Sequence, residues 1–318
     1  MGGGFSSAHF EDAFYNPWAL GLVTVPGMML TYWPGAVKDS KYNFLGVILP
    51  PTRFGVLSAN YLSYDTGEEL IEELDGTSRT IKLEEDKVIS VGYGIPLLET
   101  VFFGIQAKQL TSTLAGEYTA KATLYDAGLQ LTSLDNMHTF GVAVKDYGPK
   151  ITYLEAEEPL PTRVKAGYTL NGSRWAVGAS YEKMFSDAYT SVSLGTEYRP
   201  AASHVSLRGG IKSINNALKY TLGMGLNFDR MNVNLSYQIK SDKDIGDAPL
   251  ILSLNWFWGS RDNDAQQSDY RERGMTERAR AVRDRKFEAD SDDDMPGMSP
   301  QNKDSTDWLK WYYKLKKD

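Results

Sequence analysis

Five charged residues lie on the polar side of segments in which polar and apolar residues alternate. They are Lys108, Glu182, Arg208, Lys212 and Lys240. Basic and acidic side chains on one face support two kinds of chemistry: ion pairing between opposite charges, and the lining of a path for polar solutes. Both require that this face be enclosed. We favour ion pairs that hold an enclosed segment in place.

Residues typical of catalysis or metal binding are present but not grouped. The three histidines, His9, His138 and His204, are far apart and lack the spacing of metal ligands. No Gly-x-Ser-x-Gly motif marks a hydrolase nucleophile, and Gly223-Met-Gly225 lies in a predicted strand with no helix after it, unlike a phosphate-binding loop. The absence of cysteine excludes disulfides and thiolate metal sites. We therefore expect no enzyme activity, no metal and no cofactor.

The segments around these charges have the alternation of β-strands. Residues 220–228 and 231–240 place large apolar side chains at every second position, with Asn, Ser, Thr, Gly, Gln or Lys between them. Because side chains alternate between the two faces of a strand, each segment has one apolar and one polar face. The polar face lacks the composition of a core, and the apolar face is too rich in large residues for contact with water. A membrane-spanning β-barrel, apolar outside and polar inside, accommodates both faces.

Turn signals divide residues 27–258 into about fourteen such strands. They are residues 27–33, 42–49, 53–63, 87–95, 99–111, 117–131, 137–146, 161–170, 173–184, 188–199, 203–213, 217–228, 231–241 and 248–258. Most connections are short, but Tyr64–Asp86 and Tyr147–Pro161 are longer, and Glu68–Leu74 within the first has helical spacing. Alternation of short turns with longer loops is typical of outer-membrane barrels.

Aromatic residues near the strand ends predict the interfacial girdles of a transmembrane barrel. They are Tyr32, Trp33, Trp175, Tyr181, Tyr189, Tyr198, Tyr220, Trp256 and Trp258. The alternative is a soluble β-sandwich, whose strands also alternate. Its aromatic residues, however, are expected between the two sheets rather than near the strand ends. The barrel is therefore favoured.

Composition agrees with this class. The 318 residues carry a net charge of −7 without a basic stripe, which argues against nucleic-acid binding. No apolar run is long enough to predict a transmembrane helix, whereas a transmembrane strand needs only about 9–11 residues. The sequence does not open with a signal peptide. An outer-membrane location therefore requires that this sequence be a processed or incomplete form of the protein.

Two segments flank the predicted barrel. Residues 1–26 are rich in glycine and aromatic residues and predict a packed, irregular segment, with a short helix near Ser7–Phe14. Residues 259–318 carry 13 Lys/Arg and 14 Asp/Glu and predict a charged tail. An amphipathic pattern near the end of this tail suits contact with a membrane surface or a protein partner. Its apolar side consists of Trp308, Leu309, Trp311, Tyr312 and Leu315.

Residues 1–258 resemble the PorV/PorQ-type proteins, which are relatives of the FadL-like outer-membrane barrels. The resemblance rests on Met1-Gly-Gly-Gly-Phe5, on Asp12-Ala-Phe-Tyr-Asn-Pro17 and on Thr139–Lys150. Shorter matches are Leu160-Pro161, Val164–Tyr168, Gly195–Tyr198 and Leu207–Gly210. The chain departs from the family's pattern at Trp18-Ala19, where the family has Ala-Gly, and at Asp146, where it has Asn.

The resemblance implies a barrel of about fourteen strands in the bacterial outer membrane, with both termini and the charged tail in the periplasm. Residues 1–26 would fold inside as a hatch, and the five charged residues would face the lumen. The hatch residues would include Phe5, Asp12, Phe14, Tyr15, Asn16 and Pro17.

PorV-type members act in type IX secretion, so the resemblance implies a component that receives, shuttles or anchors exported proteins. Its partners would be outer-membrane lipid and a translocon subunit or exported cargo. Two alternatives are a FadL-like transporter of hydrophobic solutes and a structural subunit of an envelope assembly. We favour the exported-protein role, because the predicted lumen is polar and the tail suits contacts.

Overall fold

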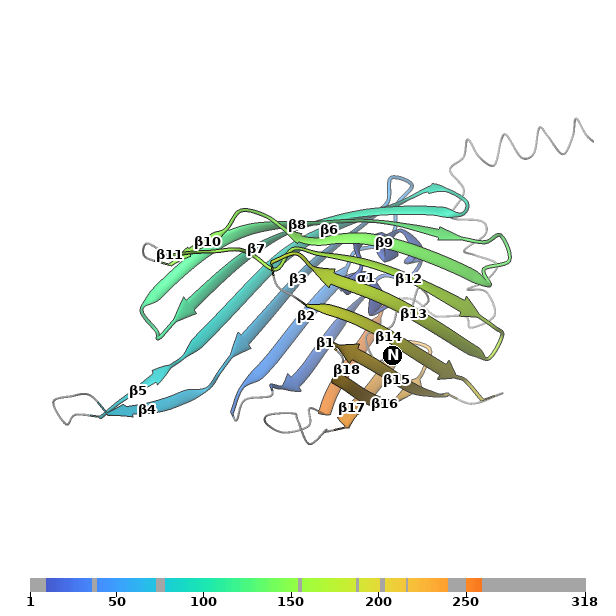
Figure 1. Ribbon diagram of the computed structural model, residues 1–318. Coiled ribbons are helices and arrows are strands. Elements are labelled where there is room, and N and C mark those ends of the chain that lie inside the picture. The colour runs from blue at the N-terminus through green and yellow to red at the C-terminus, as the bar shows by residue number, and fades with distance from the viewer. Residues whose placement is uncertain are drawn as a thin grey trace, which may run out of the picture. The chain divides into compact units, whose positions relative to one another are not determined.

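The computed structural model describes residues 10–35, 39–72, 78–153, 156–186, 189–200, 204–215, 217–239 and 250–258. Fourteen antiparallel strands close into a barrel (Figure 1), as predicted from the sequence. All described residues belong to one compact unit, Met1–Thr276. The tail from residue 259 onward, with the predicted contact residues Trp308–Leu315, lies outside the described residues. Within those residues no helix is long and apolar enough to span a membrane.

The barrel strands follow one another around the wall in chain order. They are β1 (Gly27–Pro34), β2 (Lys41–Ile48), β3 (Val56–Asp65), β6 (Glu84–Leu98), β7 (Val101–Leu114), β8 (Tyr118–Thr132), β9 (His138–Tyr147), β12 (Arg163–Asn171), β13 (Trp175–Met184), β14 (Thr190–Tyr198), β15 (Val205–Ile214), β16 (Ala217–Asn227), β17 (Met231–Ile239) and β18 (Leu250–Phe257). The barrel closes where β1 pairs with β18, from Gly27 opposite Phe257 to Tyr32 opposite Leu252. Each predicted strand overlaps one of these.

The alternation predicted from the sequence separates an apolar outer face from a polar inner one. In β17, Asn232 and Asn234 are buried on the lumen side, whereas Leu235 and Tyr237 are exposed outside. Register also places outward aromatic residues near both ends of the wall. Trp175 lies opposite Tyr198 near one end, and Tyr181 lies six residues further along β13 near the other. The outer face therefore has the aromatic borders of a membrane-spanning barrel.

Two predicted girdle residues, Trp33 and Tyr189, lie on the lumen side, Tyr189 against the lumen-facing Lys212. Trp33 is part-buried on the lumen side of β1, where its ring stacks on Tyr42 of β2. Tyr32, the residue before it, is exposed on the outer face. A position near the strand end does not show which way Trp33 points. The face is set by the alternation of side chains along the strand.

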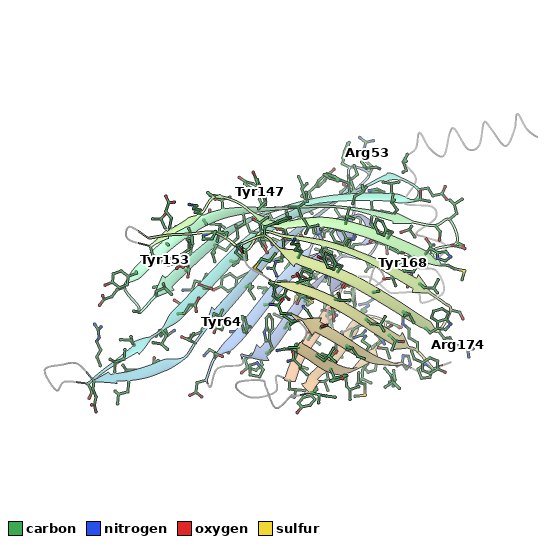
Figure 2. All side chains as sticks on the ribbon, viewed as in Figure 1. Arg53, Tyr64, Tyr147, Tyr153, Tyr168 and Arg174 are labelled. Atoms are coloured by element: carbon green, nitrogen blue, oxygen red, sulfur yellow. The ribbon has the colours of Figure 1, made fainter. Side chains whose placement is uncertain are left out.

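The two ends of the barrel carry different connections. One end has the short β6–β7 turn (residues 99–100) and the β12–β13 turn, where Figure 2 shows Arg174. The other end has the longer connections between β3 and β6 and between β9 and β12, near Tyr64 and Tyr153 in Figure 2. Strands β6, β7 and β8 have 14 or 15 residues each and are the longest in the wall.

The helical spacing noted at Glu68–Leu74 does not correspond to a helix over the residues that the structure describes there. Residues Glu68–Glu72 form strand β4, which pairs with β5 (Ser78–Lys82) in a projecting hairpin. Pairing between the two arms overrides the local helical spacing, since propensity is a weak prior against tertiary context. At the base of the hairpin, the Lys82 ammonium lies 2.9 Å from the Asp65 carboxylate, and this hydrogen bond raises the pKa of Lys82.

A second hairpin, β10 (Ile151–Tyr153) with β11 (Ala156–Glu158), covers the inner face of the long strands. Ala120, Ala122 and Leu124 of β8 are buried together with Ile151 and Leu160. This small core is separate from the larger one around the N-terminal segment. It stabilises the part of the β6–β8 sheet that extends furthest toward the end with the long connections.

Candidate functional site

The described N-terminal segment, residues 10–26, lies inside the barrel and is called the hatch below. It contains the helix α1 (Asp12–Tyr15) and the 3₁₀ helix η1 (Pro17–Leu22). The η1 helix contacts β3, β6, β7 and β8. A barrel of about eight strands is filled by its own side chains, so a fourteen-strand wall leaves space for an inserted segment. The hatch occupies part of that space.

The predicted hatch residues that the structure describes occupy different environments. Phe14, Asn16 and Pro17 are buried and Asp12 is half-buried, whereas the Tyr15 side chain is exposed toward the lumen. Phe5 lies outside the described residues. The hatch core also contains Trp18 and Leu20, which are 1% and 0% exposed. Phe14 packs edge-on against Phe10 and Phe44, which joins the hatch to β2.

Glycines in the wall make room for the hatch. A Cβ on Gly128 of β8 would lie 2.0 Å from the Trp18 ring, and a Cβ on Gly104 of β7 would lie 2.0 Å from the Pro17 carbonyl oxygen. Gly46 faces the Phe14 ring in the same way. Only a residue without a side chain permits such close approach of wall and hatch. One side of the barrel is therefore shaped to hold this segment.

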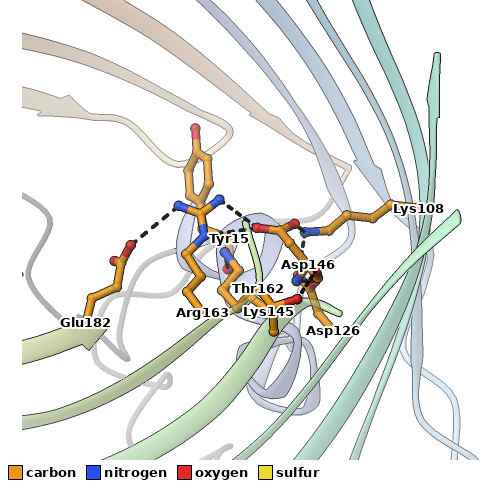
Figure 3. Close-up of polar contacts among 8 residues, drawn as sticks. All are labelled: Tyr15, Lys108, Asp126, Lys145, Asp146, Thr162, Arg163 and Glu182. Carbon is orange, nitrogen blue, oxygen red and sulfur yellow. Dashed lines mark hydrogen bonds and ion pairs between the residues drawn. The ribbon is translucent and has the colours of Figure 1, made fainter. Parts of the chain in front are cut away.

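Polar groups hold both ends of α1. At its start the Glu11 carboxylate accepts hydrogen bonds from the side-chain amides of Asn234 and Asn255, the second at 2.9 Å. At its end the Lys145 ammonium donates to the Tyr15 carbonyl oxygen at 2.7 Å (Figure 3). A cation at the C-terminal carbonyls of a helix is electrostatically favourable. The wall thus clamps the hatch helix from two sides, through β17–β18 and through β9.

A β-bulge in β9 supplies the second of these clamps. Ala127 of β8 pairs with Val144, and Tyr125 pairs with Tyr147, so Lys145 and Asp146 together stand opposite one residue. Asp146 has a φ of 55°, a left-handed conformation that Asp and Asn tolerate better than most residues. Its amide, left without a ladder partner, donates to the Asp126 carboxylate at 2.8 Å.

The bulge turns Asp146 into the centre of an ion-pair network (Figure 3). Its carboxylate lies 2.7 Å from the Lys108 ammonium and 2.6 Å from the Arg163 guanidinium. Lys108 also pairs with Asp126 at 2.6 Å, and Arg163 with Glu182 at 3.4 Å. Because the carboxylates are largely buried, loss of one partner would leave an uncompensated charge. The network fixes the strand that carries Lys145.

A second network begins on the next strand around the wall, β14, and includes a residue of β15. Glu197, which is 1% exposed, pairs with Arg208 at 2.7 Å and with Arg199 at 2.5 Å. The Arg208 guanidinium also donates a hydrogen bond to the side-chain amide oxygen of Asn234, Oδ1, at 2.8 Å. Asn234 therefore links this network to Glu11 of the hatch.

The five charges singled out in the sequence are thus divided between several surroundings. Lys108 and Glu182 belong to the first network and Arg208 to the second. Lys212 lies over the Tyr189 ring, with its ammonium 6.0 Å from the ring centre, and Lys240 lies outside the described residues. Sequence reasoning missed the partners of the first three. These partners are Asp126, Asp146, Arg163 and Glu197. Sequence reasoning also missed Glu11 and Lys145, which hold the two ends of the hatch helix.

A cavity of about 250 Å³ lies between the hatch and the wall, and we call it the hatch cavity. The hatch contributes Glu11 and Tyr15 to its lining. The wall contributes Thr31, Trp33, Arg208, Gly209, Thr221, Leu222, Gly223, Asn234, Leu235, Ser236, Ile251 and Ser253. The side chains that face this cavity are mostly polar, with Trp33, Tyr15 and Ile251 as the large apolar or aromatic ones, and such a mixture can bind a small molecule through hydrogen bonds and apolar contact.

The two described histidines, His138 and His204, do not line this cavity. His138 hydrogen-bonds the Tyr168 hydroxyl at 2.7 Å, and His204 lies 2.9 Å from the Asn227 carbonyl oxygen. His9 lies outside the described residues. In the part of the chain that is described, no three His, Asp or Glu side chains are grouped to hold a metal ion. The groups that line the hatch cavity can form hydrogen bonds and apolar contacts with a bound molecule.

No family model matches the chain, and no curated protein matches it. Solved structures do. The toluene transporter TodX of Pseudomonas putida matches with a TM-score of 0.56 and 12% identity, over 81% of this chain and 96% of TodX. A ΔS2 mutant of TodX, described as a monoaromatic hydrocarbon channel, matches with a TM-score of 0.57 and 12% identity, over 82% and 97% of the two chains.

A FadL homologue from Pseudomonas aeruginosa matches with a TM-score of 0.54 and 11% identity, over 80% of this chain and 95% of that chain. At such identities the likeness is one of fold. The closer resemblance to PorV/PorQ-type proteins, with its link to type IX secretion, stays a prediction. The chain is a closed fourteen-strand β-barrel, similar in fold to the FadL-like outer-membrane barrels.

Proposed function

We propose that the protein is an outer-membrane channel that passes small, largely apolar molecules through the hatch cavity. This proposal is supported by the cavity that lies beside the hatch, in a barrel that shares its fold with a toluene transporter. The sequence alone favours a role with exported proteins. The fold and the cavity support the alternative, transport of hydrophobic solutes, better than that role.

The bacterial outer membrane is the proposed location, with both chain ends on the periplasmic side. The outer face of the wall carries exposed Leu, Val and Ile residues between its aromatic borders, which suits a lipid environment. The chain enters the barrel wall at Gly27 and leaves it at Phe257. These two residues pair with each other at the end of the barrel that has the short turns. Outer-membrane barrels have short periplasmic turns and long extracellular loops.

The asymmetry of the lumen suggests how a solute could pass without removal of the hatch. The hatch packs on the glycine-containing surface of β6, β7 and β8. The facing wall, β15 to β18, presents short side chains to the cavity, among them Thr221, Ser236 and Ser253. Short side chains leave space, and their hydroxyls supply hydrogen bonds for polar parts of a solute. The cavity is smaller than the roughly 300–1,000 Å³ of sites for drug-sized ligands, which favours small solutes.

Filling the cavity is expected to stop uptake. Thr221 faces the cavity from β16, and a Thr221→Trp side chain would occupy much of its volume. We expect cells that carry this variant to take up labelled toluene no faster than cells without the protein. The matched control is Thr196→Trp, because Thr196 is exposed on the outer face of β14. Rapid uptake by the Thr221 variant, with the protein present in the outer membrane, would contradict the proposed path.

A second function, binding of an exported or envelope protein, is favoured by the β4–β5 hairpin. The hairpin projects beyond the barrel wall (Figure 1), and Leu70 and Ile71 are 67% and 38% exposed on it. Leu70 and Ile71 are consecutive in β4, so each face of the projecting hairpin offers one apolar side chain for contact with a protein. The long connection between β9 and β12 lies at the same end.

This second function predicts a loss of cross-linked partner when the hairpin is made polar. Leu70→Lys with Ile71→Lys is expected to abolish the cross-link to a stoichiometric partner in native outer membranes. Leu134→Lys serves as the control, since Leu134 is also exposed but lies in a turn at the opposite end. Equal cross-linking by both variants would show that the hairpin does not contact the partner.

A further inference from the structure

A groove of about 380 Å³ crosses the outer face of the barrel over β18, β1, β2 and β3, and we call it the outer groove. At the usual strand spacing, these strands span about 14 Å. The apolar and aromatic residues that line the groove on the outer face are Leu30, Tyr32, Leu45, Tyr61, Leu252 and Leu254. The groove is therefore part of the surface that faces lipid.

Strand register explains the hollow. Leu30 and Tyr32 of β1 point outward and belong to two neighbouring rows of side chains that cross the strands. Thr31 lies between them and points inward, so the backbone of β1 forms the floor of the groove there. Inside a membrane the surroundings are already apolar, so close packing, rather than transfer from water, favours an occupant that fits. A hydrocarbon chain can lie between the two rows.

Polar side chains border the groove toward the end of the barrel that has the long connections. Asn43 of β2 lines the groove and lies opposite Ser63 of β3, and Ser63 lies opposite Lys87 of β6. At the usual strand spacing, the Lys87 backbone is about 10 Å from that of Asn43. Lys41 precedes Asn43 by two residues on the same face of β2, and both lysines are exposed. Two ammonium groups therefore lie beside the polar border of the groove.

The neighbouring carboxylates leave an excess of positive charge at this border. Lys87 pairs with Glu85 at 3.0 Å, but their side chains are 46% and 30% exposed, and exposed pairs contribute little stability. Glu85 also lies 3.9 Å from Lys82, which pairs with Asp65 at 2.9 Å. Together with Lys41, three lysines face two carboxylates there. An anion can therefore bind at this border.

We infer that the outer groove binds an acyl chain of a membrane lipid whose headgroup contains a phosphate, with that phosphate beside Lys41 and Lys87. The apolar groove continues the lipid-facing surface, and the lysines complement the charge of the phosphate. Tyr32 and Tyr61 also line the groove, and tyrosine is common where a membrane surface changes from apolar to polar. The inference goes beyond solute transport and does not depend on passage through the hatch cavity.

The test is native mass spectrometry of the full-length protein released from detergent, with dioleoyl phosphatidylglycerol as the probe. We expect one lipid molecule to be retained more tightly than any further ones. Dioleoylglycerol has the same chains without the phosphate, and inorganic phosphate has no chain. Both are expected to bind more weakly, by about tenfold or more, because each lacks one of the two contacts.

Filling the groove tests the site of the chain. Leu45→Trp places a large side chain in the groove, and we expect it to weaken binding of the probe by about tenfold. The matched control is Leu194→Trp, because Leu194 is also exposed on the outer face, on β14, away from the groove. The control should bind the probe like the unaltered protein.

Removing charge tests the site of the phosphate. Lys41→Gln combined with Lys87→Gln is expected to weaken binding by about thirtyfold, from about tenfold or slightly less for each lysine. The matched control combines Lys121→Gln with Lys183→Gln, which change exposed lysines on the outer faces of β8 and β13.

Equal affinity of the two tryptophan variants would overturn the groove as the site of the chain. Equal affinity of the two lysine variants, or binding of dioleoylglycerol as tight as that of the probe, would overturn the site of the phosphate. A lipid-free dimer that Leu45→Trp separates would overturn the inference by showing that a second copy covers the groove. Uptake of labelled toluene by the Leu45→Trp protein is expected to be unchanged, so failure of the lipid site and failure of the channel give different results.

Discussion

Replacing Gly104 with alanine is expected to displace the hatch and to turn the barrel into an ion-conducting pore. The new Cβ would lie 2.0 Å from the Pro17 carbonyl oxygen and 2.2 Å from its carbon. Both are backbone atoms, so no side-chain rotation can relieve the overlap, and overpacking of this kind costs about 1–3 kcal/mol or more. The barrel strands keep their pairing, because an alanine side chain is compatible with a strand.

The measurement is the conductance of single proteins in planar bilayers. We expect the unaltered protein to conduct poorly and the Gly104→Ala protein to open a pore, because the hatch no longer fills its part of the lumen. The control is Gly209→Ala, whose new Cβ would have its nearest neighbour at 3.9 Å, the Thr196 methyl group. A folded Gly104→Ala barrel that conducts like the control would show that the close fit of wall and hatch does not keep the lumen closed.

Replacing Asp146 with asparagine is expected to lower the free energy of unfolding by about 3–5 kcal/mol, the usual cost of breaking a buried ion pair. Asparagine has nearly the same shape and also tolerates the left-handed conformation of the bulge, where φ is 55°. The change therefore isolates the loss of charge between Lys108 and Arg163. The resemblance to PorV/PorQ-type proteins makes this variant informative, because asparagine is their residue at this position.

Denaturant unfolding in detergent micelles measures this difference. The control is Glu157→Gln, because the Lys150–Glu157 pair is 60% exposed on both sides and such pairs contribute about 0–1 kcal/mol. If the two variants unfold at the same denaturant concentration, the buried network contributes no more than a surface pair and cannot fix the strand that carries Lys145.

Much of the barrel could be predicted from the sequence, because period-two alternation is set by strand geometry and by the two different environments of the wall. Met231–Ile239 shows this most clearly, since every second residue faces the lumen. Sequence reasoning was less informative where alternation was not used. Trp33 was placed in a girdle from its position near a strand end. The helical spacing of Glu68–Leu74 gave no indication of strand β4, whose structure is decided by its hairpin partner at Ser78–Lys82.

The candidate site was less accessible to sequence reasoning, because its contacts join residues far apart in the chain. Glu11 meets Asn234 and Asn255 across more than 220 positions, and no local pattern signals such a contact. The sequence of β9 does, however, contain an indication of the bulge. Phe140, Val142 and Val144 face outward, so strict alternation would place the Asp146 carboxylate on the lipid side. A charge at such a position is costly, and a bulge that returns it to the lumen is the structural solution.

Small solutes are proposed to pass while the hatch stays seated. Uptake of labelled toluene and of a labelled disaccharide can be compared in porin-deficient cells that carry the protein. We expect toluene to enter faster than in cells without the protein, and the disaccharide to enter no faster. Entry of both solutes would show that the hatch does not close the lumen, and accelerated entry of neither would show that the protein is not a channel.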